Sequence, residues 1–83
     1  MLEAKDARQL TDRMATELLK MHTRWVLTRA DLEIEQAVQH GGDMALVDTA
    51  DLYPGAVNKA ISELEALGYE AWELDSGILK IKW

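Results

Sequence analysis

Two histidines, His22 and His40, are the side chains best suited to metal binding or acid–base chemistry in this chain. A zinc site needs three or four protein ligands, and neither histidine has a second histidine or a cysteine at ligand spacing. The run from His40 to Asp43 offers two ligands at most, so we expect no metal site and assign His40 to the last turn of a helix. The chain contains no cysteine, which excludes disulfides and thiolate ligands.

Hydroxyl and carboxylate groups give no stronger sign of catalysis. Ser62 and Ser76 lie outside any serine-elbow motif, and the glycine pair at 41–42 lacks the lysine and hydroxyl residue of a phosphate-binding loop. Asp48 and Asp51 are close enough in sequence to act as an acid and a base, but 83 residues leave little room for an enclosed substrate cleft. We therefore expect a protein that is not an enzyme and uses no cofactor. A small enzyme would require a deep pocket with convergent polar groups.

The chain is acidic, with a formal charge of −6 from 15 acidic and 9 basic residues. The acidic residues are scattered, as on an ordinary soluble surface, and their field repels nucleic acid and anionic lipid. A surface that mimics nucleic acid is the alternative. No apolar run approaches the ~20 residues of a membrane span. Residues 1–6 alternate charged and apolar side chains, unlike a signal peptide. We expect a cytoplasmic protein.

The stretch from Met1 to His40 has neither glycine nor proline, which indicates helix. Placed at about 100° per residue, its apolar side chains form two stripes on opposite sides. One straight helix would present both stripes, more apolar surface than a small monomer can cover. The first stripe is Ala7, Leu10, Met14, Leu18, Met21 and Trp25, and the second is Leu27, Ala30, Ile34, Ala37 and Val38.

A break near Trp25 would remove this conflict, because each half could then turn its own stripe inward. Thr28 is an acceptable N-cap for a second helix. The sequence therefore predicts helices over 3–22 and 29–40, joined by a tight bend. An unbroken helix used for dimerisation is the alternative.

The second half of the chain alternates short apolar runs with turn-forming residues. Residues 43–48 read as a strand. Pro54 suits the first position of a helix over 54–67, whose apolar residues recur every three or four positions, and Gly68 suits its end.

The C-terminal residues predict a β-hairpin. With a two-residue turn at 76–77, Glu73 faces Lys80 and Trp72 faces Ile81, which would place Trp72 in the core. A longer loop over 75–77 is the alternative.

The expected architecture is therefore α+β: two N-terminal helices, then a β-α-β-β unit. The first strand joins the hairpin through the final strand, and this three-stranded antiparallel sheet packs on the 54–67 helix. The chain forms a single domain over 1–83, with a helical part over 1–42 and a β-α-β-hairpin part over 43–83.

Apolar and aromatic side chains are the candidates for contact with a partner. Trp25 lies at the expected bend, Tyr53 in a loop, and Trp83 at the end of the last strand with an aromatic edge available. Methionines on a helix face are more often adaptable core than a partner groove. The predicted interaction residues are Leu10, Met14, Leu18, Met21, Trp25, Tyr53 and Trp83.

Three short stretches carry a family resemblance: Ala4–Thr11, Leu67–Glu70 and Ile81–Trp83. They are similar to stretches in small uncharacterised α+β proteins encoded by tailed bacteriophages, and together cover under a quarter of the chain. The resemblance implies a phage accessory or virion-associated protein in the host cytoplasm, and it transfers no functional residue.

The order of strand, helix and hairpin also resembles a winged helix, with 56–67 as recognition helix and 75–77 as wing. The outward face of that helix carries Lys59 and Glu63, so it has few of the cationic contacts that DNA binding needs. Our hypothesis is a non-catalytic protein-binding or accessory module, a homo-oligomer with an unidentified protein partner. A winged-helix-like nucleic-acid-binding regulator is the alternative.

Overall fold

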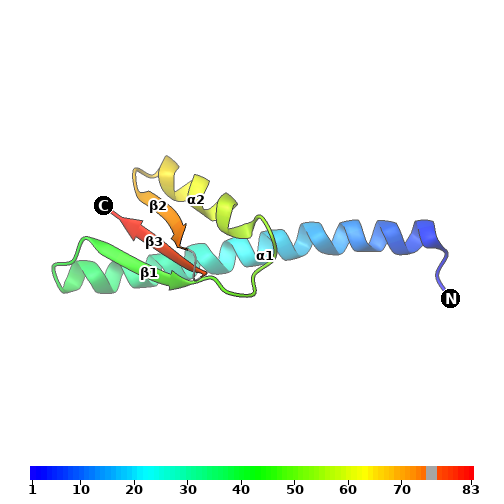
Figure 1. Ribbon diagram of the computed structural model, residues 1–83, viewed down its shortest axis with the longest axis horizontal. Helices are drawn as coiled ribbons and strands as arrows, with labels where there is room; N and C mark the ends of the chain where they lie inside the picture. Colours follow the sequence, from blue (N-terminus) through cyan, green and yellow to red (C-terminus); the bar gives the residue numbers. More distant parts are fainter. Residues whose placement is uncertain (75–76) are drawn as a thin grey trace.

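The computed structural model describes residues 1–74 and 77–83. Figure 1 shows one helix running the length of the molecule, with the strands and a second helix gathered beside its C-terminal half. The molecule measures 57 × 24 × 17 Å. The elements are α1 (Ala4–Gln39), β1 (Met44–Asp48), α2 (Ala56–Ala66), β2 (Glu70–Leu74) and β3 (Ile78–Lys82).

The N-terminal region is one continuous helix of 36 residues, so the predicted division into helices over 3–22 and 29–40 is wrong. Nothing between Thr23 and Thr28 breaks a helix, because β-branched residues lower helix propensity by less than about 0.7 kcal/mol each. The Thr23 hydroxyl donates a 2.6 Å hydrogen bond to the backbone oxygen of Leu19 and is thereby satisfied inside the helix. α1 therefore runs through the region of the expected bend, and Trp25 lies on its surface rather than between two helices.

The sheet is antiparallel with the strand order β1-β3-β2, which confirms that the first strand pairs with the last. One face of the sheet packs against α1 and α2, and the side chains between these layers form the core. In α1 the second apolar stripe supplies this contact, through Ala30 and Ile34 among others. The buried core comprises Val26, Ala30, Ile34, Ala45, Val47, Val57, Ala60, Leu64, Leu79 and Ile81.

The second helix begins at Ala56, two residues later than predicted, because Pro54 belongs to the preceding turn. The Ala56 N–H donates to the Tyr53 carbonyl at 3.1 Å, and Gly55 has φ 92°. Proline followed by a left-handed glycine is the pattern of a type II turn.

Gly68 ends α2, as predicted. Gly68 has φ 95°, and its N–H donates to the Glu65 carbonyl. The Tyr69 N–H donates to the Leu64 carbonyl, which completes a Schellman motif. This turn directs the chain straight from α2 into β2.

The β2–β3 register differs by one residue from the prediction. Glu73 pairs with Leu79, not with Lys80, and Trp72 pairs with Lys80, not with Ile81. Leu74 pairs with Ile78, and Asp75 of the alternative loop over 75–77 lies outside the described residues. Of the predicted turn at 76–77, Ser76 lies outside the described residues. Gly77 has φ 77°, the left-handed residue that often ends a three-residue hairpin loop.

This shift moves Trp72 to the face of the sheet that points away from the helices. Trp72 is 39% exposed, so its predicted place in the core is wrong. Ala71 takes that place, opposite Ile81 and partly buried against the core. The ammonium of Lys80 lies 5.4 Å from the Trp72 ring centroid, a cation–π contact on this outer face.

Candidate interaction surface

The first apolar stripe of α1 lies on the side of the helix opposite the core. Its exposed fractions are 55% for Met14, 61% for Met21 and 49% for Trp25. Leu10 is also exposed, and Leu18 is partly buried. The structure thus brings these five predicted interaction residues together along one outer side of one helix.

This outer side follows a seven-residue repeat. Leu18, Trp25 and Leu32 are seven residues apart, and a second series, offset by three, contains Met14 and Met21. Alternating spacings of three and four are the pattern of a coiled-coil contact line. We call the two series together the α1 seam, which consists of Ala7, Thr11, Met14, Leu18, Met21, Trp25, Thr28 and Leu32.

Leu32 was missed by the sequence analysis. It is 42% exposed and extends the α1 seam by a further repeat beyond Trp25. The seven-residue spacing from Leu18 is the signal that could have identified it. The expectation of a bend near Trp25 separated it from the rest of the stripe.

Three shallow hollows, of about 440, 380 and 420 Å³, lie along the α1 seam. The residues that line each hollow include four at positions i, i+3, i+4 and i+7. In a coiled coil, four residues at this spacing form the hole that receives one side chain of the partner helix. The sets are Ala7-Leu10-Thr11-Met14, Met21-Arg24-Trp25-Thr28 and Thr28-Asp31-Leu32-Glu35.

The N-terminal part of α1 projects beyond the body of the domain (Figure 1). Residues 1–14 are exposed, except Asp6, which is partly buried. Isolated helices shorter than about 12–15 residues are marginal in water. This segment, which we call the arm, therefore gains little stability from its own domain and would be stabilised by contact with another chain.

Tyr53 lies beside the α1 seam. It lines the same hollow as Leu10 and Leu18, and its backbone N–H donates a 2.6 Å hydrogen bond to Nδ1 of His22. This hydrogen bond connects the loop before α2 to α1. His22 is one of the two histidines considered for chemistry.

Trp83 packs elsewhere. Its ring meets that of Tyr69 edge to face, with centroids 6.0 Å apart and an interplanar angle of 88°. It remains 37% exposed, but the structure does not bring it to the α1 seam.

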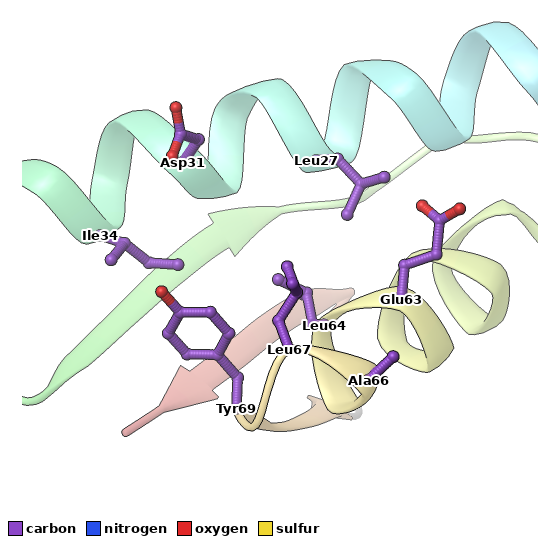
Figure 2. Close-up of a pocket in the computed structure, with 8 residues that line it drawn as sticks. All are labelled: Leu27, Asp31, Ile34, Glu63, Leu64, Ala66, Leu67 and Tyr69. Atoms are coloured by element: carbon purple, nitrogen blue, oxygen red, sulfur yellow. The ribbon is translucent and has the colours of Figure 1, made fainter.

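A further hollow of about 410 Å³ lies between α1 and α2. Figure 2 shows Leu27 and Ile34 of α1 on one side of this hollow and Leu64 and Tyr69 on the other. Glu63 stands at the rim. Leu67 also lines this hollow and is 74% exposed, so the hollow is open to solvent. Its lining is mostly apolar, with the carboxylates of Asp31 and Glu63 as its charged groups.

The outer face of the sheet is a second exposed apolar surface. The register places Leu46, Lys80 and Trp72 in one row across β1, β3 and β2. Leu74 is also exposed on this face, which the predicted register had assigned to solvent-facing charged residues. The sequence analysis missed this surface because it turned Trp72 and Leu74 inward.

Ser62, one of the polar residues considered for chemistry, is exposed on α2. The Ser62 hydroxyl donates to the Asn58 carbonyl within α2, and Ser76 is not among the described residues. Over residues 1–74 and 77–83, no three histidine, aspartate or glutamate side chains lie close enough together to hold a metal ion. No helix in this described part is both long and apolar enough to cross a membrane.

Comparisons with known proteins identify no relative, so the function is inferred from the surfaces of the molecule. The resemblance to phage proteins remains a hypothesis. No family model matches the chain, and neither the curated proteins nor the solved structures contain a match.

Proposed function

We propose that this chain is a non-catalytic protein-binding module that acts through the α1 seam. The observation that supports this function is that a single continuous helix carries an apolar stripe on each of two opposite sides. One side of α1 packs in the core through Val26, Ala30 and Ile34, and the other is exposed from the arm to Leu32, except for the partly buried Leu18. Contiguous exposed apolar surface of this kind is typical of sites of protein association.

The composition of the seam fits such a role. Trp25 and the neighbouring Arg24 are residue types that often dominate binding energy at protein interfaces. Met14 and Met21 are flexible and polarizable, so they adapt to the shape of a partner. A helix anchored by its C-terminal half and projecting with its N-terminal half can occlude a partner surface or bridge two chains. An accessory role in a phage, as the resemblance implies, is compatible with this mode of action.

The proposal is tested by a seam variant and a matched control on the same helix. Met14→Lys/Met21→Lys places two cations on the seam. Gln9→Lys/Thr16→Lys places two cations on the opposite side of the helix, where both residues are exposed. We expect the wild type and the control to associate with protein, and the seam variant to lose this association while keeping its fold by circular dichroism.

Association is measured in two ways: by light scattering of the purified chain, and by capture from lysate of the native host. Capture supports the proposal where the same protein band is retained by the wild type and by the control and is lost with the seam variant. If the purified chain stays monomeric and no captured protein depends on the seam, the proposal is wrong.

A further inference from the structure

We infer that the partner of the α1 seam is the α1 seam of a second copy, in an antiparallel pair. This inference rests on the proposed function and specifies its partner. In the pair, Leu18 faces Met21 of the second copy and Trp25 faces Met14. Leu32 faces Ala7 at the ends.

The hollows along the seam fit this arrangement. The hole bordered by Met21, Arg24, Trp25 and Thr28 lies opposite Met14 of the second copy, and the next hole, around Leu32, lies opposite Ala7. The central layers then consist of methionine, leucine and tryptophan. Contact between methionine sulfur and the tryptophan ring adds a favourable interaction there.

The charges beside the seam select this register. In the antiparallel pair, Glu17 of each copy lies beside Arg24 of the other, which makes two attractive contacts. Sliding the helices by one repeat brings either Arg24 against Arg24 or Glu17 against Glu17. A parallel, in-register pair instead places Arg24 beside Arg29 of the other copy, and like charges across such positions are unfavourable.

The chosen register has one kind of like-charged contact, which occurs twice, between Arg8 of each copy and Arg29 of the other. It lies toward the ends of the pair. The guanidinium of Arg29 is also compensated within its own helix by Glu33, at 3.1 Å.

The area is sufficient for a specific interface. About 16 residues of each copy lie on or beside the seam. In a standard interface, 20–30 residues bury ~800 Å² per partner, so 16 residues would bury roughly 500 Å² per copy. The total of about 1,000 Å² reaches the lower limit for a biological interface.

The distribution of net charge favours contact through α1. α1 has six acidic and six basic residues and is neutral, so the −6 of the chain lies entirely outside it. The acidic bodies repel each other. Most of each body lies on the side of α1 opposite the seam, and only Tyr53, in the loop before α2, lies beside the seam. The antiparallel pair therefore keeps the two bodies apart.

Charge exchange tests the register. Glu17→Arg and Arg24→Glu each replace two attractive contacts by two repulsive ones, and each should raise the dimer dissociation constant about tenfold at low salt, as several weak ion pairs acting together would. The double variant restores opposite charges and should return to within about threefold of the wild type. Arg13→Glu, on a flank of α1 turned away from the seam, is the control for net charge and should change the constant by less than about twofold. Sedimentation velocity over a concentration series measures all four.

The outcomes separate this inference from the proposed function. A dimer that Arg24→Glu tightens is a parallel one, which overturns the antiparallel register but leaves a protein-binding seam. A wild type that is monomeric at ~200 µM, with seam-dependent capture of a host protein, overturns self-pairing alone. Monomers without such capture overturn both.

The lack of native cysteine allows a direct second measurement. Met14→Cys and Trp25→Cys are prepared as separate proteins and oxidised alone or mixed. In the antiparallel pair, position 14 of one copy lies beside position 25 of the other, so disulfide-linked dimers should form in the mixture and not in either protein alone. Cross-linking of Met14→Cys with itself would indicate parallel helices and overturn the inference.

Discussion

Nδ1 of His22 accepts a 2.6 Å hydrogen bond from the backbone N–H of Tyr53, and both residues are partly buried. The bond connects the middle of α1 to the loop that precedes α2. Replacing the acceptor leaves a partly buried amide without this partner, which costs about 1–2 kcal/mol. We therefore predict that His22→Ala lowers the free energy of unfolding by that amount, as measured by urea denaturation. The control, His40→Ala at an exposed helix end, should stay within about 0.5 kcal/mol of the wild type. Equal stability of the two variants would show that the bond contributes little.

A pair of substitutions in the sheet tests the observed β2–β3 register. Leu79 is fully buried, and Leu79→Ala should cost about 2–5 kcal/mol of folding free energy. Trp72 lies on the outer face, so Trp72→Ala should cost less than about 1.5 kcal/mol, much of it from the cation–π contact with Lys80. The predicted register would instead give Trp72→Ala the ~3–5 kcal/mol of a core tryptophan. Thermal and urea unfolding, compared between the two variants, distinguish these registers.

The left-handed glycine after α2 offers a test of backbone conformation alone. A Cβ atom at Gly68 would meet nothing within 4 Å, so Gly68→Ala introduces strain without a steric clash. Such a conformation costs an L-residue roughly 1–2 kcal/mol, and asparagine less. We predict that Gly68→Ala lowers the urea midpoint and that Gly68→Asn recovers part of the loss. A midpoint unchanged by Gly68→Ala would mean that the turn adopts another conformation in solution.

The arm of α1 should change its protection with protein concentration. As a monomer, residues 7–14 have little tertiary support, and their amides should exchange with solvent within seconds to minutes, close to the rate of fraying helix ends. At protein concentrations well above the dimer dissociation constant, pairing along the α1 seam should protect these amides at least tenfold, by the linkage of binding to stability. Hydrogen exchange read by mass spectrometry measures this. The Met14→Lys/Met21→Lys variant should remain unprotected at every concentration, and equal protection in both proteins would contradict seam pairing.

Local sequence signals predicted most elements of the fold. The strand at β1, the glycine end of α2 and the pairing of the first strand with the last all follow from turn residues and apolar spacing. The placement of the second apolar stripe of α1 in the core was also evident, since Ala30 and Ile34 recur at helical spacing. These features depend on neighbours in sequence or on the simplest sheet order.

The two errors in the predicted fold have different causes. The bend near Trp25 was inferred because a single chain cannot cover two opposite stripes, although no residue there stops a helix. The observed helix follows its local propensity and leaves one stripe uncovered. The hairpin register was misjudged for a different reason, because Ser76-Gly77 and the longer loop ending at Gly77 are both acceptable turns. Choosing between them required knowing that the small Ala71, rather than Trp72, fits against the core.

The central place of β3 in the sheet has a consequence for how the molecule folds. β1 and β2 are each bonded to β3 and not to each other, so neither has a strand neighbour until Ile78–Lys82 arrives. The helices can form from local contacts, whereas joining Asp48 to Ile78 requires closure of a long chain segment, which is slow relative to helix growth. Before that closure the apolar sides of both α1 and α2 are exposed to solvent. Association between chains would then compete with folding of the domain. Refolding yield should therefore fall with rising protein concentration, and substitutions in β3 should lower this yield more than substitutions in β1 or β2.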